Sequence, residues 1–231
     1  MERDYDIEMV RLNKADYGDV NFSLCLEDDF CNDKVFKRME TAIDTTFINL
    51  LEYWIPRYTL KQLRYANAIK DVEGIFNFAE RASQWLHRKK GIDYGPSFID
   101  YSYFGNGFVT LVCRKVFETP DMVTYGIFTD GYYYGTCGNT EQIRYYTIEK
   151  ATGHVLTIKD ILKKHSKEKL NEKIWNEVKP WKPDDNGYYA DLDYVSLANG
   201  CAIVKDGVLF YFFPYNIGCA AEGQFNIVVQ L

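Results

Sequence analysis

Hydrophobic positions in the first half of the chain follow a helical period. From Asn32 to about Trp54, apolar residues recur every three or four positions, and asparagine is a favoured residue at a helix N-terminus. Pro56 predicts the end of this helix, because proline lacks a backbone N–H and clashes with the preceding turn. The same period predicts a second helical region from Thr59 and a third over residues 71–89.

Strand patterns dominate the second half. Short runs rich in β-branched and aromatic residues, bounded by glycine, asparagine or proline, predict strands. With two earlier runs of the same kind, the predicted strands are residues 5–12, 20–26, 97–103, 108–117, 122–129, 142–149, 155–158, 194–197, 202–205, 208–213 and 225–230. One polar helix is predicted over residues 166–178.

Helices gathered early and strands gathered late predict an α+β fold rather than alternating βαβ units. The sequence Gly105-Asn106-Gly107 between two strand runs is typical of a hairpin. We therefore expect a mainly antiparallel sheet with helices packed on one face. No internal repeat or low-complexity linker is visible, which favours one compact unit.

Composition then narrows the possible functions. Acidic residues outnumber basic ones, 33 to 27, and no dense basic block occurs, so nucleic-acid binding is disfavoured. The sequence contains no apolar run of about 18 residues, so it predicts no membrane-spanning helix. The charged residues that follow Met1 do not resemble a signal peptide, so an exported protein would carry its targeting segment outside this sequence.

Six cysteines occur without a Cys-x-x-Cys pair, and only three histidines accompany them. This pattern argues against a zinc site, and we expect neither a metal nor a cofactor. An even number of cysteines is compatible with disulfides in an oxidising compartment, and six buried thiols are the alternative.

Two segments resemble the C-terminal domain of RsiV-type and PdaC-type bacterial extracytoplasmic proteins. Residues 132–162 contain a glycine-rich loop, a Thr152-Gly153 turn and a final Asp-Ile-Leu, where the family has Gly-Gly-Ala-His-Gly, a Thr-Gly turn and Asp-Leu-Phe. Residues 206–229 follow the family's Phe-x-Pro-Tyr-x-Ile motif and its glycine-closed loop. The matching residues are Phe213, Pro214, Tyr215, Ile217, Ala221 and Gly223.

The resemblance implies an RsiV C-terminal-like domain over residues 121–231. Residues 1–120 resemble, only by element order, the domain that usually precedes it. RsiV-like proteins sense lysozyme by binding it, and PdaC-like proteins carry the domain beside a separate deacetylase. The resemblance thus implies a non-catalytic binding or sensing module of the bacterial cell envelope, secreted or a lipoprotein, whose partner is a lysozyme-like protein or peptidoglycan.

Two departures from the family pattern concern cysteine. Cys137 replaces the loop histidine and Cys219 replaces a proline of the second loop. Because we expect the two loops to be neighbours, this paired change predicts a disulfide between them, and two small buried residues are the alternative. Such a bond would close a loop of about 80 residues, worth roughly 4 kcal/mol or more. The remaining cysteines are expected to form a second pair, Cys25 with Cys31, and two buried thiols, Cys113 and Cys201.

Aromatic residues beside the two loops are the expected contact surface. Tyr133, Tyr134 and Tyr215 could stack on sugar or contact a protein, with Gly135 and Asn139 shaping the first loop. The alternative is that alternate tyrosines pack into the sheet.

A wall-polysaccharide hydrolase is the alternative function. Asp130, Glu141 and Glu222 lie in or beside the two loops, and a glycosidase needs two carboxyl groups about 5–9.5 Å apart. Solvated, scattered acids would favour the binding module instead. We expect a binding module rather than an enzyme, and no catalytic residue is assigned.

Overall fold

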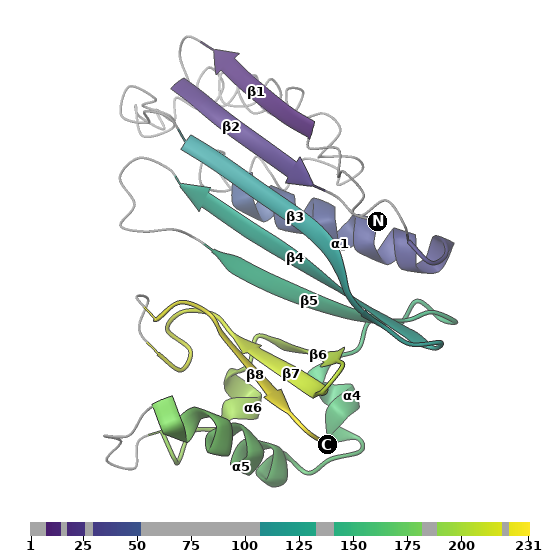
Figure 1. Ribbon diagram of the computed structural model, residues 1–231, viewed down its shortest axis with the longest axis vertical. Helices are drawn as coiled ribbons and strands as arrows, with labels where there is room; N and C mark the ends of the chain where they lie inside the picture. Colours follow the sequence, from purple (N-terminus) through teal and green to yellow (C-terminus); the bar gives the residue numbers. More distant parts are fainter. Residues whose placement is uncertain are drawn as a thin grey trace, which may run out of the picture. The chain divides into compact units, whose positions relative to one another are not determined.

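The computed structural model describes residues 8–14, 18–25, 30–51, 107–132, 141–181, 189–218 and 222–231 (Figure 1). Two compact units share the chain. One holds Met1–Leu26, Met39–Val112 and Thr129–Thr140, and the other holds Glu27–Arg38, Cys113–Phe128 and Glu141–Leu231. The elements are β1 (Glu8–Lys14), β2 (Gly18–Cys25), α1 (Asp33–Leu51), β3 (Gly107–Glu118), β4 (Met122–Tyr132), β5 (Gln142–Glu149), α4 (Ile158–Leu162), α5 (Lys167–Val178), η4 (Lys179–Trp181), α6 (Tyr194–Leu197), β6 (Gly200–Val204), β7 (Gly207–Phe212) and β8 (Phe225–Val229).

Strands β1 to β5 form one sheet in chain order. In the first unit, β1 and β2 make an antiparallel pair that runs from Glu8 opposite Leu24 to Lys14 opposite Gly18. Strands β2 and β3 pair in parallel, from Val20 opposite Gly107. A parallel pair needs a long crossover, and here the crossover contains α1.

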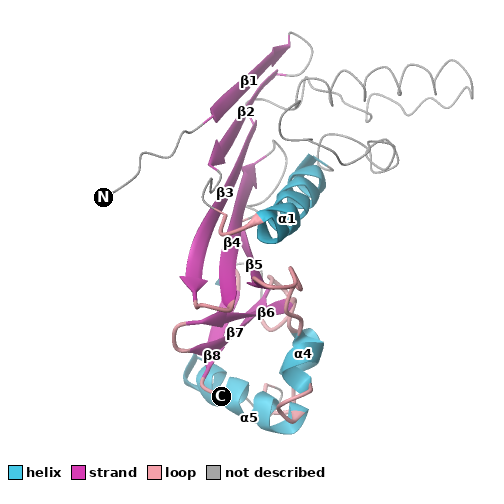
Figure 2. Ribbon diagram, turned by 90° about the vertical axis from the view of Figure 1, so that its right-hand side faces the viewer, coloured by secondary structure: helices cyan, strands magenta, loops and turns pink. Residues whose placement is uncertain are grey.

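Helix α1 follows its sequence pattern closely. The side chain of Asn32 caps it, because Oδ1 accepts hydrogen bonds from the backbone N–H groups of Lys34 and Val35, both at 3.0 Å. The apolar positions at helical spacing are buried: Val35, Met39, Ile43, Phe47 and Leu50. Figure 2 shows α1 as one uninterrupted helix (cyan).

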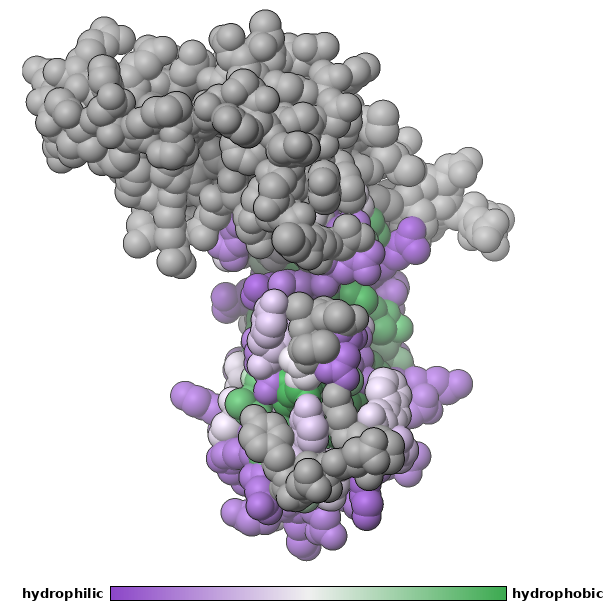
Figure 3. All heavy atoms as spheres, turned by 90° about the vertical axis from the view of Figure 1, so that its left-hand side faces the viewer, coloured by the Kyte–Doolittle hydropathy of each residue, from purple (hydrophilic) through white to green (hydrophobic). Residues whose placement is uncertain are grey.

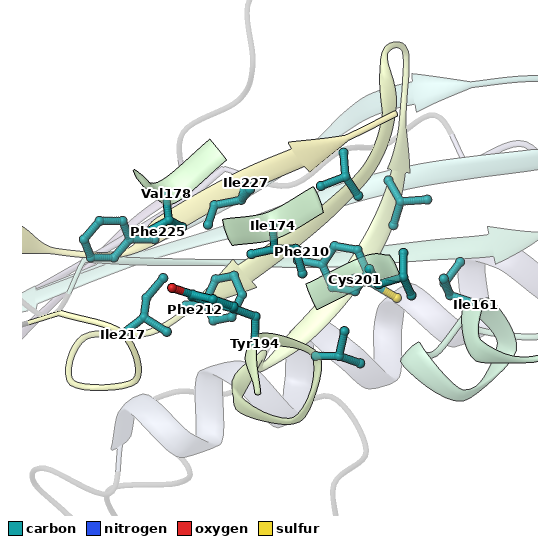
Figure 4. Packing of buried hydrophobic residues seen from close by; sticks show 14 residues of the cluster. Ile161, Ile174, Val178, Tyr194, Cys201, Phe210, Phe212, Ile217, Phe225 and Ile227 are labelled. Atoms are coloured by element: carbon teal, nitrogen blue, oxygen red, sulfur yellow. The ribbon is translucent and has the colours of Figure 1, made fainter. Parts of the chain in front are cut away.

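The second unit contains a three-stranded antiparallel sheet in the order β6-β7-β8. Helix α5 places Leu170, Ile174 and Val178 against this sheet, where Phe210 and Phe212 of β7 are fully buried (Figure 4). Burying a side chain of this size contributes about 1.5–3 kcal/mol, so this cluster stabilises the unit.

Strand β5 is joined to the three-stranded sheet by side chains that substitute for backbone pairing. The hydroxyl of Thr147 accepts from the N–H of Ile203 at 2.8 Å, and the hydroxyl of Thr124 donates to the carbonyl of Ile203 at 2.7 Å. The two hydroxyls lie 2.8 Å apart. At the other end of β5, the amide of Gln224 bonds both the N–H (2.7 Å) and the carbonyl (2.9 Å) of Ile143. Both contacts satisfy backbone groups that an edge strand would otherwise leave open.

The α+β class and the mainly antiparallel pairing are confirmed, but two predicted strands are wrong. Residues 194–197 form helix α6, because Asp193 caps it by accepting from Ser196 N at 3.3 Å. Residues 155–158 form only one bridge, between Val155 and Ile148. The chain then enters α4, whose start is held by a capping box between Thr157 and Asp160.

The helices predicted from Thr59 and over residues 71–89, and the strand over 97–103, lie outside the described residues. Among the helices that the structure describes, none is long and apolar enough to span a membrane.

Candidate functional site

The candidate site is the turn after β7, residues Phe213–Ile217, called here the Tyr215 turn. The N–H of Asn216 donates to the carbonyl of Phe213 at 3.1 Å, which closes a four-residue turn. Pro214 takes the second position, where its fixed φ fits, and Tyr215 takes the third with φ 73°. A positive φ at the third position is the signature of a type II turn, where glycine is the favoured residue.

Polar side chains pin this turn to the rest of the unit. Asn199 Oδ1 accepts from the N–H of Phe213 at 2.6 Å and from Asn216 Nδ2 at 3.0 Å. Asn216 Nδ2 also donates to the carbonyl of Leu197 at 2.6 Å. Ile217, the last residue of the turn, is buried in the core cluster. The backbone of the turn is therefore fixed on both sides of Tyr215.

The side chain of Tyr215 projects into solvent and is 79% exposed, the highest value among the large hydrophobic side chains described as exposed. A left-handed backbone costs a residue with a Cβ about 1–2 kcal/mol. Tyr215 is the one residue other than glycine with a positive φ among the residues described. The fold thus retains strain at a position where the side chain makes no compensating core contact.

A row of aromatic rings leads away from the base of the turn. The ring centroids of Phe213 and Tyr211 are 5.7 Å apart, as are those of Tyr211 and Tyr145. The guanidinium of Arg144 lies 4.8 Å from the centre of the Phe213 ring, a cation–π contact. Gly200 leaves the space for the Tyr211 phenol, because a Cβ at Gly200 would lie 2.3 Å from the phenol oxygen.

Burial makes these tyrosines unsuited to acid–base work. Desolvation raises the pKa of Tyr211 to about 12, and burial also raises the pKa of Tyr145. Both phenols stay protonated near neutral pH. The row therefore offers apolar faces and hydrogen-bond donors rather than a general base.

Most of the predicted contact and disulfide residues lie outside the described residues. These are Tyr133, Tyr134, Gly135, Cys137, Asn139 and Cys219. The proximity of the two loops and the Cys137–Cys219 disulfide therefore stay predictions. Cys113 and Cys201 are buried thiols, as expected, whereas Cys31 is an exposed thiol, so the Cys25–Cys31 pair is not formed.

The three loop acids belong to different units of the chain. Asp130 belongs to β4 in the first unit, and Glu141 and Glu222 are exposed residues of the second. The carboxylate of Glu222 lies beside Gly218, where a Cβ would come within 2.5 Å of Oε2. The hydrolase alternative stays a prediction.

His154 and Asp160 resemble a catalytic histidine–acid pair but have a structural role. His154 Nε2 lies 3.0 Å from Asp160 Oδ2, and Thr157 donates to the same oxygen from its N–H at 3.0 Å and its hydroxyl at 2.7 Å. Lys163, then Thr157 and His154, hold the pKa of Asp160 far below its ordinary range. The ionised carboxylate caps α4. Within the described ranges, no group of three His, Cys, Asp or Glu side chains could hold a metal ion.

Sequence reasoning missed the residues that hold the turn. Asn199 and Asn216 were not singled out, although an asparagine directly before Gly200 and another directly after Pro214-Tyr215 are turn signals. Their long-range bonds join positions 14 to 19 residues apart, which local patterns do not reveal.

The C-terminal part of the chain matches a known family. Residues 159–231 match the family described as a protein of unknown function, DUF3298. The chain carries a DUF3298 domain. This DUF3298 domain includes the Tyr215 turn and the core cluster below it.

Two solved structures of DUF3298 family proteins are similar to the whole chain. One, from Bacteroides fragilis NCTC 9343, is 14% identical with a TM-score of 0.56, over 98% of this chain and 90% of that chain. Another, from Pseudomonas aeruginosa PAO1, is 11% identical with a TM-score of 0.51, over 99% and 91%. At these identities the likeness shows the fold alone. No curated protein matches the chain.

Proposed function

We propose that this protein is a non-catalytic binding or sensing module of the bacterial cell envelope, which recognises a lysozyme-like protein or peptidoglycan through the Tyr215 turn. One observation carries the proposal. Tyr215 is 79% exposed and holds a left-handed backbone with φ 73° that a tyrosine adopts only at a cost. An aromatic ring presented to solvent from a fixed backbone is the kind of side chain that recognition surfaces use.

The resemblance to RsiV-type and PdaC-type domains supports the same conclusion. The Phe-x-Pro-Tyr-x-Ile motif that carries the resemblance is the segment that forms the Tyr215 turn. The formal net charge of −6 favours a basic protein partner over an acidic one. In this proposal the protein is extracytoplasmic, as a secreted protein or lipoprotein.

The test measures binding to two named probes, hen egg-white lysozyme and soluble peptidoglycan fragments, by biolayer interferometry. The variants are Tyr215→Ala and, as a matched exposed aromatic elsewhere in the same unit, Phe36→Ala, whose wild-type side chain is 43% exposed. We expect Tyr215→Ala to weaken binding of one probe at least tenfold, about 1.4 kcal/mol, and Phe36→Ala to change it less than twofold. Equal binding by wild type and Tyr215→Ala would refute the role of the turn.

The hydrolase alternative is tested on the same preparations. Release of soluble fragments from labelled peptidoglycan, abolished by Glu141→Gln or Glu222→Gln, would replace the binding proposal with the enzyme. Absence of turnover together with Tyr215-dependent binding would retain the binding module.

A further inference from the structure

A groove runs beside β8, and no residue of the Tyr215 turn lines it. One part, about 460 Å³, lies between the end of α5 with η4 and the start of β8, and Trp181 and Phe225 line it. A second part, about 480 Å³, lies farther along the strand, beside Lys173 and Asp206. Glu177 and Val228 line both parts, so the two parts adjoin along the strand, and together they are called here the β8 groove.

The β8 groove has an exposed aromatic residue at one end. Trp181 is 71% exposed, and its ring centroid lies 6.3 Å from that of Phe225. Val178 and Ile227 lie next to Phe225 at this end of the core cluster (Figure 4). Green hydrophobic atoms show between purple hydrophilic ones toward the bottom of Figure 3. A partly covered indole of this kind is a typical anchor for an apolar side chain.

The strand that forms one wall of the groove is an edge strand. Within the described residues, β8 pairs with β7 and has no strand on its other side. Alternate residues of an edge strand direct both their N–H and C=O groups away from the existing partner. The five residues of β8 therefore offer hydrogen bonds to an extended chain of about 17 Å. A sugar or a helix could not satisfy this regular array.

The charged residues that line the β8 groove indicate what kind of extended chain it would bind. Glu177 and Asp206 are exposed and form no ion pair with another described residue, whereas Lys173 Nζ is occupied by the carbonyl of Gln230. Lys173 keeps its positive charge in that bond, so the two acids and the one lysine leave the lining with a net charge of −1. In a symmetric pair of two copies joined through β8, Glu177 beside the middle of the strand would face its own counterpart, which opposes self-association.

We infer that the β8 groove binds an extended, basic peptide segment by strand addition, with an apolar side chain over Trp181 and Phe225 and a lysine or arginine beside Glu177. The partner is a protein with such a segment exposed. This site is separate from the residues of the Tyr215 turn, so each can fail without the other.

The test uses the full chain, labelled with ¹⁵N, and a designed probe, acetyl-Thr-Lys-Thr-Phe-Thr-Lys-Thr-amide. Its alternating pattern places lysine and phenylalanine on one face in either strand direction. Three control peptides carry glutamate for lysine, N-methyl groups on the threonines, or N-methyl groups on the lysines and phenylalanine. Two charge reversals on α5 are compared, Glu177→Lys in the groove and Glu172→Lys, which is exposed outside it.

We expect the basic peptide to shift the amide signals of residues 226–229 and the Trp181 indole signal, and the glutamate peptide to leave them unchanged. One N-methylated peptide should bind and the other should not, because only alternate backbone N–H groups face the strand. Glu177→Lys should weaken binding at least tenfold and Trp181→Ala at least fivefold. Glu172→Lys and Tyr215→Ala should stay within twofold.

Four outcomes would overturn the inference: no shifts at millimolar basic peptide, equal shifts with the glutamate peptide, equal binding of both N-methylated peptides, or dimerisation through β8 in sedimentation. Retained peptide binding in a chain that binds neither lysozyme nor peptidoglycan would leave the inference standing and remove only the proposed function.

Discussion

Two turns of the second unit have the same unusual backbone and opposite surroundings. Gly153 and Tyr215 both have φ 73°. Gly153 is buried in its turn, and a Cβ there would lie 3.2 Å from Cβ of Lys34. Tyr215 is 79% exposed. Glycine thus occupies the position where another residue would crowd the structure, whereas tyrosine is kept where glycine would fit without strain.

The contacts of the two turns explain this difference. The carbonyl groups of the Gly153 turn hold the start of α1: Gly153 O accepts from Arg38 Nε at 2.9 Å, and Ala151 O from Lys34 Nζ at 2.5 Å. In each of these bonds the turn contributes a backbone carbonyl and no side chain, so the turn acts as a structural support for α1. In the Tyr215 turn, bonds to Asn199 and Leu197 hold the backbone while the ring itself is left in solvent. The comparison indicates that one turn is structural and the other presents a side chain.

The largest expected effect is at the structural turn. Gly153→Ala should lower the free energy of unfolding by about 2–3 kcal/mol, from the strain of a left-handed alanine plus crowding against Lys34. Gly223→Ala is the matched control, because Gly223 has φ 74° and open space around its Cβ position. It should cost only the strain, about 1 kcal/mol. Urea unfolding measures both, and equal losses would show that the contact with Lys34 has no weight.

A smaller loss is expected when the support of the Tyr215 turn is removed. Asn216→Ala deletes the donor to Leu197 O and Asn199 Oδ1, which should lower stability by about 1–2 kcal/mol. It should also weaken partner binding as Tyr215→Ala does, because the ring is no longer held in place. Asn176→Ala on α5 is the control, with no expected loss of stability. Unchanged partner binding in Asn216→Ala would mean that rigidity of the turn is irrelevant.

The third prediction has the opposite sign. Tyr215→Gly should raise the free energy of unfolding by about 0.5–1 kcal/mol, since relief of strain exceeds the greater chain entropy of unfolded glycine. Partner binding should be lost at the same time. Tyr215→Ala keeps the strain and should show the binding loss without the gain in stability. A destabilised Tyr215→Gly protein would end the interpretation of this residue as strained for function.

Much of the fold follows from local pattern. Helix α1 and strand β5 were predicted within a few residues, because one strong period and clear breakers define each. Helix α6 was missed, since Tyr194 and Val195 favour strands and only the cap from Asp193 turns them into a helix. The parallel pairing of β2 with β3 was also missed, because partners separated by a long crossover leave no local signal.

The candidate site was only partly predictable. Tyr215 was identified by the motif that surrounds it, but its positive φ and its exposure come from bonds to Asn199 and Leu197 that no local pattern encodes. The β8 groove was not predicted at all. Trp181 lies between the polar helix and a loop in the sequence, and only the packing of α5 on β8 brings it beside Phe225.

The smallest expected effect concerns the charge beneath the Tyr215 turn. Asp193 caps α6, and the last residue of this helix, Leu197, offers its carbonyl to the Tyr215 turn. The carboxylate of Asp193 lies 2.5 Å from Lys167 Nζ. Lys167 first, then Ser196 and Asn171, lower the pKa of Asp193 to about 2 from 3.8. A carboxyl with a lowered folded-state pKa stabilises the fold above its ordinary value, and this contribution is lost as pH falls through about 2.

Asp193→Asn should therefore cost only about 0.5 kcal/mol at pH 7, because the pair is exposed and asparagine still caps a helix. The difference between wild type and variant should shrink between pH 4 and pH 2, and 1 M salt at pH 7 should reduce it. Asp191→Asn, also exposed, should leave stability at pH 7 unchanged. Urea unfolding at several pH values measures these differences. The probe whose binding Tyr215→Ala weakens is then measured with Asp193→Asn. Unchanged binding would show that the bonds of Asn199 and Asn216 hold the turn without the Asp193 carboxylate.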